Sequence, residues 1–392
     1  GGYAMSSIYL SHLGIVNSLG AGPIEVSKRL LGNLVGDAES FLEPYSKLFS
    51  GRGTWVGRVN TDLPKIPAHL KNYSCRNNQL LLAAFQQVET EVRAVIRDVG
   101  PSRVAVVLGT STSGMSERER FIRGDLKEMS YQQQEIGNCS QFLADYLDLS
   151  GISYTISTAC SSSAKVFISA QRLIDGGLCD AVIVGGSDSL CELTLNGFDC
   201  LESVSEKVSN PFSKNRRGIN IGEGAAVFLM SKNKSPIKFF GGSESSDGHH
   251  ISAPDPTGRG AEIAIRGALS QAKLTPRDIG YVNLHGTATV INDSMESAIM
   301  HSIFGSEIIM SSTKPMVGHT LGAAGAIELA FCYLSLLNPE KRLPKHLWDN
   351  EQDPLLPKLR LVTENDRWEQ PIFMSNSFAF GGNNASLIIG LE

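Results

Sequence analysis

The sequence predicts an α/β fold built from two similar halves that share one core. Strand-like apolar runs alternate with stretches of helical periodicity along the 392 residues. The runs are continuously apolar, which is typical of strands in sheets that helices cover on both faces. Two short patterns also recur in the same order in the first and second parts of the chain, which favours a duplicated unit.

The expected elements follow from this alternation. Strands are expected at the short apolar runs, and helices where apolar residues recur at intervals of three and four. The expected strands are Arg103–Leu108, Ile152–Ser157, Asp180–Val184, Ala225–Met230, Ile279–Leu284, Ile308–Ser312 and Ala385–Ile389. The expected helices are Asn78–Asp98, Cys160–Asp175, Ala261–Lys273, Asp293–Phe304 and Gly322–Leu337.

The repeated patterns lie on either side of a polar, proline-containing stretch, Ser231–Pro236. The matching pairs are VVLGTSTSG (106–114) with VNLHGTATV (282–290), and GEGAAVFLMS (222–231) with GGNNASLIIG (381–390). Residues before Met5 are set aside as a cloning remnant. We therefore expect one half at residues 5–235 and the other at residues 236–392.

Composition excludes several classes of protein. A net charge of −5 gives no reason to expect a nucleic-acid partner. The seven cysteines are scattered and form no Cys-x-x-Cys pair, which argues against disulfides or a zinc site and favours a reducing compartment such as the cytoplasm. The longest apolar stretch, Ala323–Leu337, contains Glu328 and is too short to span a membrane, so we expect a buried core helix there.

Cys160 lies where a strand-like run breaks into small residues and then into an amphipathic helix. Free backbone N–H groups and the helix dipole favour a thiolate at such a helix start, and the thiolate is the nucleophilic form of cysteine. The alternative interpretation is a small buried hydrophobic residue.

Two histidines also follow strand-like runs in turns of small residues. His285 comes after the run 281–284, and His319 lies between Gly318 and a Gly/Ala-rich helix start, with Lys314 shortly before it. Taken singly, each histidine has an alternative role as a satisfied structural residue, and Lys314 as a solvated charge. Together with Cys160 they indicate a thiolate aided by two imidazoles, an arrangement suited to acyl transfer.

These motifs resemble those of the elongating β-ketoacyl-[acyl-carrier-protein] synthases of the thiolase superfamily. The ordered set is TACSSS, HGTAT, KxxxGHTxGAAG and NSFxFGG, and the resemblance runs from about Ser6 onward. It implies a thiolase-like duplicated five-layer αβαβα fold. It also implies that Cys160 accepts an acyl chain as a thioester, while His285 and His319 bind the carbonyl oxygen of malonyl-carrier protein and stabilise the enolate formed on decarboxylation.

The same resemblance implies further roles. Phe380 gates access to Cys160, and its backbone N–H and that of Cys160 form an oxyanion hole. Thr287 and Thr289 contact the phosphopantetheine arm. Lys314 and Glu296 organise the histidines. No metal or other cofactor is expected. The implied partners are acyl carrier protein and a second subunit, which is either an identical copy or a chain-length factor; no membrane span is expected.

The chain also departs from the family pattern. Ala379 stands where the family usually has glycine between two phenylalanines, which puts the motion of the gate in question. The segment before Gly218 is shorter than usual, so the face that meets the acidic carrier protein is expected to differ. Candidate contacts, with solvated surface charge as the alternative, are Lys65, Lys207, Lys214, Arg216 and Arg217.

Other proteins of the superfamily fit less well. A thiolase needs a second catalytic cysteine near the C-terminus, whereas the last cysteine here is Cys332 in a core-helix pattern. An initiating synthase normally has asparagine where this chain has His319. A non-catalytic chain-length factor typically lacks the cysteine that is present here. The motifs around His285 and His319 are most similar to those of aryl-polyene-type synthases, in which a ketosynthase pairs with a chain-length factor and is active only with that partner.

Overall fold

Continuous apolar runs form one large mixed β-sheet in the computed structural model of the chain, which describes residues 6–32, 38–111, 138–247, 254–379 and 381–392. Within these residues the sheet has 12 strands, and a separate three-stranded sheet lies beside it. The strands of the large sheet are β1 (Ile8–Asn17), β2 (Gly20–Ala21), β5 (Val104–Gly109), β6 (Ser153–Ile156), β7 (Ala181–Asp188), β9 (Gly224–Ser231), β10 (Ile237–Ser246), β11 (Tyr281–Asn283), β12 (Ile309–Ser311), β13 (Arg360–Leu361), β14 (Ile372–Phe378) and β15 (Asn383–Leu391). The small sheet contains β3 (Glu43–Tyr45), β4 (Thr54–Gly57) and β8 (Ile221–Gly222).

Strand order confirms the duplication. In the first half the order from the centre outward is β1, β9, β7, β5 and β6, and in the second half it is β10, β15, β14, β11 and β12. With the two-residue strands β2 and β13 left out and the other strands of each half numbered in chain order, both series run first, fifth, fourth, second, third. In both halves the first two pairings are antiparallel and the next two are parallel. Antiparallel pairing of β1 with β10 joins the two halves into one sheet.

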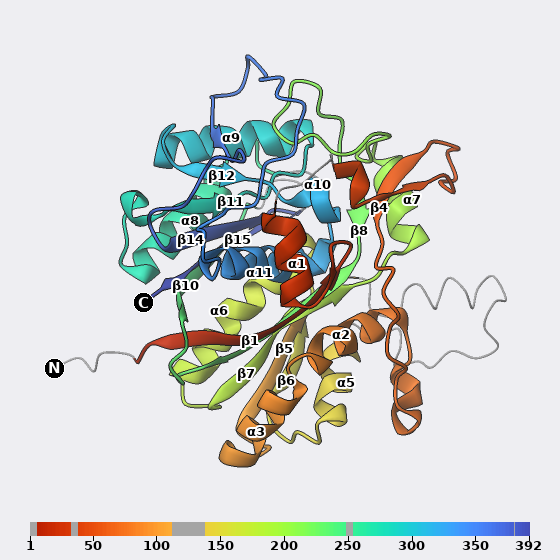
Figure 1. The fold of residues 1–392 in the computed structure, drawn as a ribbon, viewed down its shortest axis with the longest axis vertical. Helices are drawn as coiled ribbons and strands as arrows, with labels where there is room; N and C mark the ends of the chain where they lie inside the picture. The colour runs from red at the N-terminus through yellow and green to blue at the C-terminus, as the bar shows by residue number, and fades with distance from the viewer. Residues whose placement is uncertain (1–5, 33–37, 112–137, 248–253, 380) are drawn as a thin grey trace.

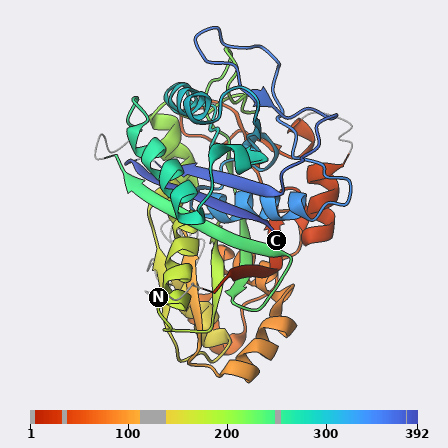
Figure 2. The ribbon, with the colours of Figure 1, turned by 90° about the vertical axis from the view of Figure 1, so that its left-hand side faces the viewer.

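Helices cover both faces of each half and give five layers (Figures 1 and 2). Helices α6 and α11 pack together between the two halves, while α2 and α5 cover the outer face of the first half and α8 covers that of the second, beside α9. The helices are α1 (Pro23–Leu31), α2 (Arg76–Gln86), α3 (Glu89–Val99), α5 (Asn138–Tyr146), α6 (Ser162–Asp175), α7 (Glu192–Cys200), α8 (Arg259–Ala272), α9 (Val290–Phe304), α10 (Lys314–Val317) and α11 (Ala324–Leu336).

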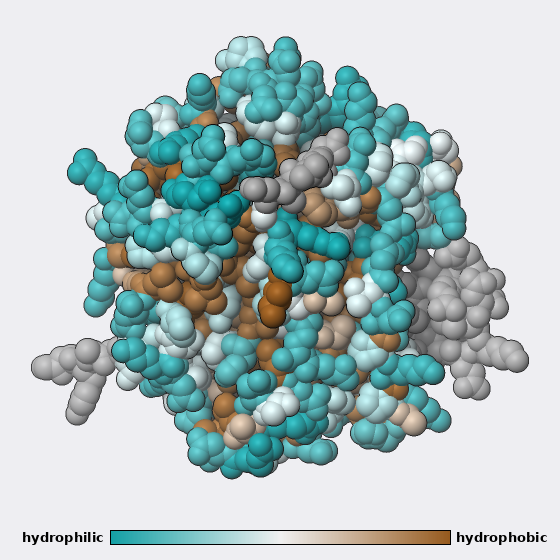
Figure 3. Space-filling model, viewed as in Figure 1, coloured by the Kyte–Doolittle hydropathy of each residue, from teal (hydrophilic) through white to brown (hydrophobic). Residues whose placement is uncertain are grey.

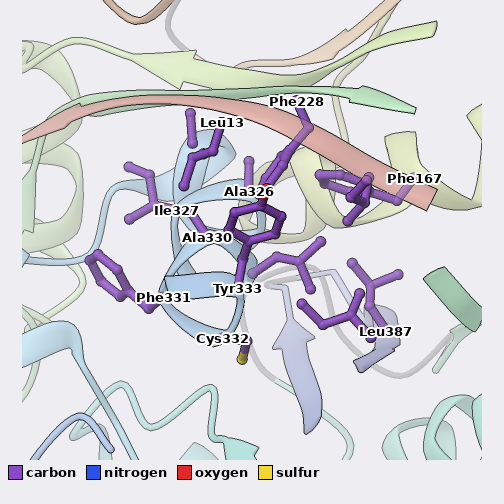
Figure 4. Packing of buried hydrophobic residues seen from close by; sticks show 14 of the residues in the cluster. Leu13, Phe167, Phe228, Ala326, Ile327, Ala330, Phe331, Cys332, Tyr333 and Leu387 are labelled. Atoms are coloured by element: carbon purple, nitrogen blue, oxygen red, sulfur yellow. The ribbon is translucent and has the colours of Figure 1, made fainter. Parts of the chain in front are cut away.

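Helix α11 is the centre of the core, as expected from its uninterrupted apolar sequence. All of its residues are buried, and Figure 4 shows its side chains packed against Leu13, Phe167, Phe228 and Leu387. It approaches α6 very closely at Gly325, where an added Cβ would lie 2.6 Å from the backbone nitrogen of Ala164. Gly325 therefore allows the two central helices to pack through their backbones.

The expected helix Asn78–Asp98 is instead two helices, α2 and α3, that meet at Gln87 and Val88. The side chain of Gln87 accepts a hydrogen bond from Ile15 N at 2.9 Å and donates one to Ile15 O at 3.0 Å. These bonds lie beside the irregular register of β1 between Ser11 and Gly14, so this tertiary contact accompanies the break between the two helices.

The surface is mainly polar in the view of Figure 3, with separate hydrophobic patches. Within the described ranges, no helix combines the length and the apolarity needed to cross a lipid bilayer.

Candidate active site

Cys160 lies in a short 3-10 turn, Ala159–Ser161, between β6 and the start of α6. It is buried, with 2% of its surface exposed. Ala159 has a φ of 51°, a left-handed conformation that costs energy in a residue with a Cβ. The predicted position of Cys160 at a helix start is therefore confirmed, and the strained residue before it sets the direction of the turn.

His285 follows β11 directly, and a carboxylate on α9 holds its turn in place. Glu296 accepts hydrogen bonds from His285 N and Gly286 N, each at 2.8 Å. Burial raises the pKa of Glu296 to about 7, although the two N–H donors lower it. Asp293, one helical turn earlier, accepts hydrogen bonds from Ala288 N at 3.3 Å and Phe212 N at 2.8 Å. Helix α9 thus fixes both ends of the turn that contains His285.

Lys314 begins α10 and is fully buried beside His285. Its Nζ lies 2.8 Å from Glu328 Oε2 on α11, 2.6 Å from His285 O and 3.4 Å from His285 Nδ1. An ammonium group has three donors and no acceptor, so these three contacts use all of its hydrogens. The contact with Nδ1 is a hydrogen bond only when that nitrogen carries no proton, which leaves the proton of neutral His285 on Nε2.

The first half of the chain holds the backbone of His319. His319 N donates to Asn220 O at 2.6 Å, and Gly222 N donates to His319 O at 3.0 Å. Its Nδ1 accepts a hydrogen bond from Leu321 N at 3.2 Å, so the proton of the neutral ring is on Nε2. This Nε2 is buried and has no hydrogen-bond partner among the described residues.

The two imidazoles lie close together in a nearly perpendicular, edge-to-face arrangement and are neutral donors. Their ring centroids are 5.5 Å apart, and each residue is 1% exposed. Burial lowers the pKa of His285 well below its ordinary value, and the charge of Lys314 and the neighbouring His319 lower it further. Burial and the charge of Lys314 also lower the pKa of His319 well below its ordinary value. Both rings are therefore neutral at pH 7 and present N–H groups without carrying charge.

Cys160 and the histidines belong to one buried region. The turn of Cys160 contacts the 3-10 turn Leu321–Ala323 that follows His319, and Cys160 shares a hydrophobic cluster with Leu321 and Ala379. On the other side, the ring of His285 lies 5.8 Å from that of Phe378, next to Ala379. Phe380, the expected gate, lies outside the described residues.

Thr287 and Thr289 lie between this buried region and the surface. Their hydroxyl groups are 2.8 Å apart, Thr287 is buried, and Thr289 is partly exposed. The next residues, Val290 and Ile291, are exposed. The two threonines therefore lie at the boundary between the buried turn of His285 and the exposed start of α9.

Sequence reasoning missed the buried partners of the site. Glu328 was noted as a charge in an apolar stretch, but its pairing with Lys314 was not predicted. Asp188, at the end of β7, accepts hydrogen bonds from Thr110 Oγ1, Ser111 N and Gly322 N. A charged residue inside a fully apolar helix was the available signal for Glu328, because a buried carboxylate needs a partner.

One suggested contact for a carrier protein is wrong. Arg216 is buried rather than exposed, and its guanidinium lies 2.7 Å from Asp353 Oδ2 and donates to Ser213 O and Val290 O. It braces the start of α9 instead of facing solvent. Lys207, Lys214 and Arg217 are exposed, although Lys214 pairs with Glu351 at 3.3 Å.

The arrangement suits acyl transfer with charge developing on a carbonyl oxygen. A buried cysteine at a helix start lies in the same buried region as two neutral N–H donors, which a lysine, carboxylates and the backbone hold in place. Among the described residues, no group of three or more His, Cys, Asp or Glu side chains is placed to hold a metal ion.

Two family models match the chain. The model described as the N-terminal domain of beta-ketoacyl synthase matches residues 62–235, and the one described as its C-terminal domain matches residues 239–346. Among curated proteins, 3-oxoacyl-[acyl-carrier-protein] synthase 2 of Rhizobium meliloti (strain 1021) is 34% identical over 315 residues, covering 75% of this chain and 68% of that protein. The chloroplastic 3-oxoacyl-[acyl-carrier-protein] synthase II of Arabidopsis thaliana is 29% identical over 419 residues, covering 97% and 75% respectively.

Solved structures show the same similarity. A chain from the structure of the ketosynthase ApeO in complex with its chain length factor ApeC, from Xenorhabdus doucetiae, has a TM-score of 0.94 and 44% identity, and each chain is covered completely, at 100%. A beta-ketoacyl synthase from Burkholderia phymatum STM815 has a TM-score of 0.84 and 25% identity, covering 99% of this chain and 100% of that chain.

Proposed function

The chain belongs to the β-ketoacyl synthase family, and on this premise we propose that it catalyses a decarboxylative Claisen condensation between an acyl thioester on Cys160 and malonyl-acyl-carrier-protein. The product is a 3-oxoacyl-acyl-carrier-protein in fatty-acid, polyene or polyketide chain elongation. The observation that carries this proposal is the buried Nε2 of His319, a donor with no partner among the described residues, on a ring whose centroid lies 5.5 Å from that of His285.

In the first step the Cys160 thiolate attacks the carbonyl carbon of the incoming acyl thioester. A new C–S bond forms to Cys160, and the bond to the pantetheine sulfur breaks and releases the carrier as its thiolate. The proposed oxyanion hole consists of the backbone N–H groups of Cys160 and Phe380. The strained Ala159 supports this assignment, because the direction of the turn sets where the N–H of Cys160 points.

In the second step the malonyl thioester loses CO2. The electron pair of the broken C–C bond moves into an enolate, whose oxygen accepts hydrogen bonds from Nε2 of His285 and of His319. The negative charge of the carboxylate is relocated rather than created, so neutral donors are sufficient. Each such donor is worth roughly 3 kcal/mol of barrier, by analogy with the loss of oxyanion-hole donors in other enzymes.

In the third step the enolate carbon attacks the acyl-Cys160 carbonyl. The new C–C bond lengthens the chain by two carbons, and the C–S bond breaks to regenerate the Cys160 thiolate. Lys314 and Glu296 are positioning residues in this scheme, since they hold the ring and backbone of His285. Thr287 and Thr289 guide the phosphopantetheine arm of the carrier protein.

We propose that the chain acts as a ketosynthase subunit beside a chain-length factor, in an aryl-polyene-type pathway. The similarity to the structure of ApeO with its chain length factor supports this assembly over a homodimer. We further propose residues 5–235 and 236–392 as the two structural halves, supported by their common strand order. A cytoplasmic location is inferred from the scattered cysteines, and cell fractionation that recovers the protein outside the cytoplasm would contradict it.

Intact mass spectrometry tests the proposal, using the chain co-expressed with its chain-length-factor partner. The wild type is expected to take up the acyl group from an acyl-carrier protein, and Cys160→Ala is expected to take up none. Cys200→Ala is the matched control, because Cys200 is the exposed cysteine on α7 and should not affect loading. An acylated Cys160→Ala protein would overturn the assignment of the nucleophile.

The histidine variants separate the loading of Cys160 from the decarboxylation of malonyl-carrier protein. His285→Ala and His319→Ala are each expected to lower the rate of malonyl-carrier-protein decarboxylation by roughly 100- to 1,000-fold. Loading of Cys160 should fall much less. Equal loss of loading and decarboxylation would show instead that the histidines serve the fold or activate the cysteine.

A further inference from the structure

His346 is a buried histidine outside the motifs that the sequence indicated. It lies between α11 and β13, is 5% exposed, and donates its backbone N–H to Val362 O at 3.1 Å. The rings of Phe212 and Trp348 pack against it, with centroids 5.9 Å and 5.6 Å from that of His346. The plane of the imidazole is therefore fixed by packing as well as by hydrogen bonds.

Both ring nitrogens of His346 are used in one defined tautomer. Ser312 N donates to Nδ1 at 3.0 Å, and Nε2 lies 2.9 Å from Pro211 O. A carbonyl oxygen can only accept, so Nε2 carries the proton and Nδ1 does not. Burial lowers the pKa of His346 to about 4, which agrees with a neutral ring at pH 7.

The first arm from His346 leads through Ser312 to the active site. Ser312 Oγ donates to Gly286 O at 2.7 Å, and Lys314 N donates to Ser312 Oγ at 3.4 Å. Ser312 therefore ties the turn of His285 to the first residue of α10. Its own backbone N–H is fixed by His346.

The second arm leads through Pro211 to the other end of the same turn. Phe212, the next residue, donates its N–H to Asp293 Oδ2 at 2.8 Å, and Ala288 N donates to Asp293 Oδ1 at 3.3 Å. The two arms thus reach the turn 285–288 at Gly286 and at Ala288. His346 is the group that both arms share.

We propose that His346 is a positioning residue that holds the turn bearing His285 in register with Lys314 through these two arms. The inference rests on the proposed function, because it assigns His346 to the decarboxylation step that His285 serves. His346 does not touch the reacting atoms. Its effect is to set the direction of the His285 donor, and small errors in such a direction are costly to the rate.

Three variants test the proposal in the complex with the chain-length factor. His346→Leu removes both hydrogen bonds. His346→Asn keeps an acceptor near the position of Nδ1 and loses the reach to Pro211. Ser312→Ala keeps His346 but cuts the first arm. Val92→Ala, a core truncation on α3 in the first half, serves as a control for general destabilisation.

We expect His346→Leu and Ser312→Ala to lower kcat for malonyl-carrier-protein decarboxylation by roughly 10- to 100-fold. KM and the rate of Cys160 loading should be unchanged, because the turn of Cys160 is not part of either arm. His346→Asn should recover part of the loss. Adding Ser312→Ala to His346→Leu should add little to the loss caused by His346→Leu alone, because His346→Leu already disturbs the first arm, in which Ser312 lies.

Three outcomes would overturn the proposal. These are unchanged decarboxylation in folded His346→Leu, equal loss of loading and decarboxylation, or the same pattern in Val92→Ala. If His346→Leu does not fold, Ser312→Ala and His346→Asn decide between the outcomes. Failure of the proposed function is distinct, because the wild type itself would then neither load Cys160 nor decarboxylate malonyl-carrier protein.

Discussion

The turns before α6 and before α11 share one backbone geometry but differ in the residue at their second position. Each is a three-residue 3-10 turn that leads into a central helix, and each begins with a non-glycine residue in the left-handed region, Ala159 with φ 51° and Leu321 with φ 53°. At the second position the first half has Cys160 and the second half has Gly322. A common backbone therefore presents a side chain in one half and none in the other.

The reason for the difference lies in what each turn faces. A Cβ on Gly322 would lie 2.6 Å from Asp188 Oδ2 and 2.7 Å from Ser111 N, and Gly322 N already donates to Asp188. The second turn is thus anchored against strand ends of the first half. In the second half, the residues with proposed roles, His319 and Lys314, come before the turn instead. Duplication supplied two equivalent backbone positions, and only the first carries a thiol, which we propose as the nucleophile.

The largest expected effect is in the second half, at the buried pair of Lys314 and Glu328. Lys314→Met leaves Glu328 buried without its cation, so we expect unfolding free energy to fall by about 3–5 kcal/mol in urea denaturation. Adding Glu328→Leu should recover much of the lost stability, because it removes the buried carboxylate that Lys314→Met leaves unpaired.

An ion pair in the first half is the matched control. Arg93 and Glu89 pair at 2.8 Å on α3 but are partly exposed, so Arg93→Met should cost about 0.5 kcal/mol or less. Similar losses for Lys314→Met and Arg93→Met would contradict the idea that the second half depends on a buried charge pair.

The next effect concerns the two turns directly. Gly322→Ala forces a Cβ against Asp188 and Ser111, and we expect it to destabilise the protein by about 1–3 kcal/mol. Gly197→Ala, in α7 where an added Cβ meets no atom within 4 Å, should instead be neutral or stabilising by up to about 1 kcal/mol. Thermal unfolding of both variants measures these changes in stability. A Gly322→Ala protein as stable as the wild type would show that Asp188 and Ser111 shift to accommodate the added Cβ.

The smallest expected effect is the pH dependence that buried histidines bring to the second half. Unfolded His346 takes up a proton below its ordinary pKa of 6.5, whereas burial lowers the pKa of the folded residue to about 4, so acid favours unfolding. Glu296 has the opposite sign, because its pKa is raised to about 7 and the folded state takes up its proton first.

The contribution of His346 is isolated by comparing how the unfolding free energy of the wild type and of His346→Leu changes with pH. Between about pH 6 and pH 5 the wild type should lose roughly 1 kcal/mol more stability than His346→Leu. Urea denaturation of both proteins at the two pH values measures this difference. Parallel curves would show that His346 is protonated in the folded protein.

Local pattern was sufficient to place the turns of Cys160 and His285 but not the contacts that hold them. Cys160 and His285 follow strands, as expected, whereas α10 lies between β12 and His319. The repeated patterns fall on equivalent strands, β5 with β11 and β9 with β15. Strands β1 and β10, which join the halves, were missed. Part of β10 is rich in Gly and Ser, and their pairing partners are distant in the sequence.

Local sequence pattern also fails to show which charged residues are buried in ion pairs. Arg216 reads as a surface residue among polar neighbours, yet Asp353, far along the chain, draws it into a buried pair. Glu328 reads as an anomaly in an apolar helix until Lys314 is placed beside it. Each case depends on a partner that local sequence pattern does not identify: Asp353 lies in the other half of the chain from Arg216, and Lys314 lies on a different helix from Glu328.

The close approach of Gly325 to Ala164 sets the distance between α6 and α11 through main-chain atoms. The central helices meet through main-chain atoms, so the spacing between the cysteine turn and the histidine turn does not depend on the sizes of nearby core side chains. Core side chains elsewhere can therefore change in size while this contact keeps the cysteine turn and the turn after His319 at a constant spacing.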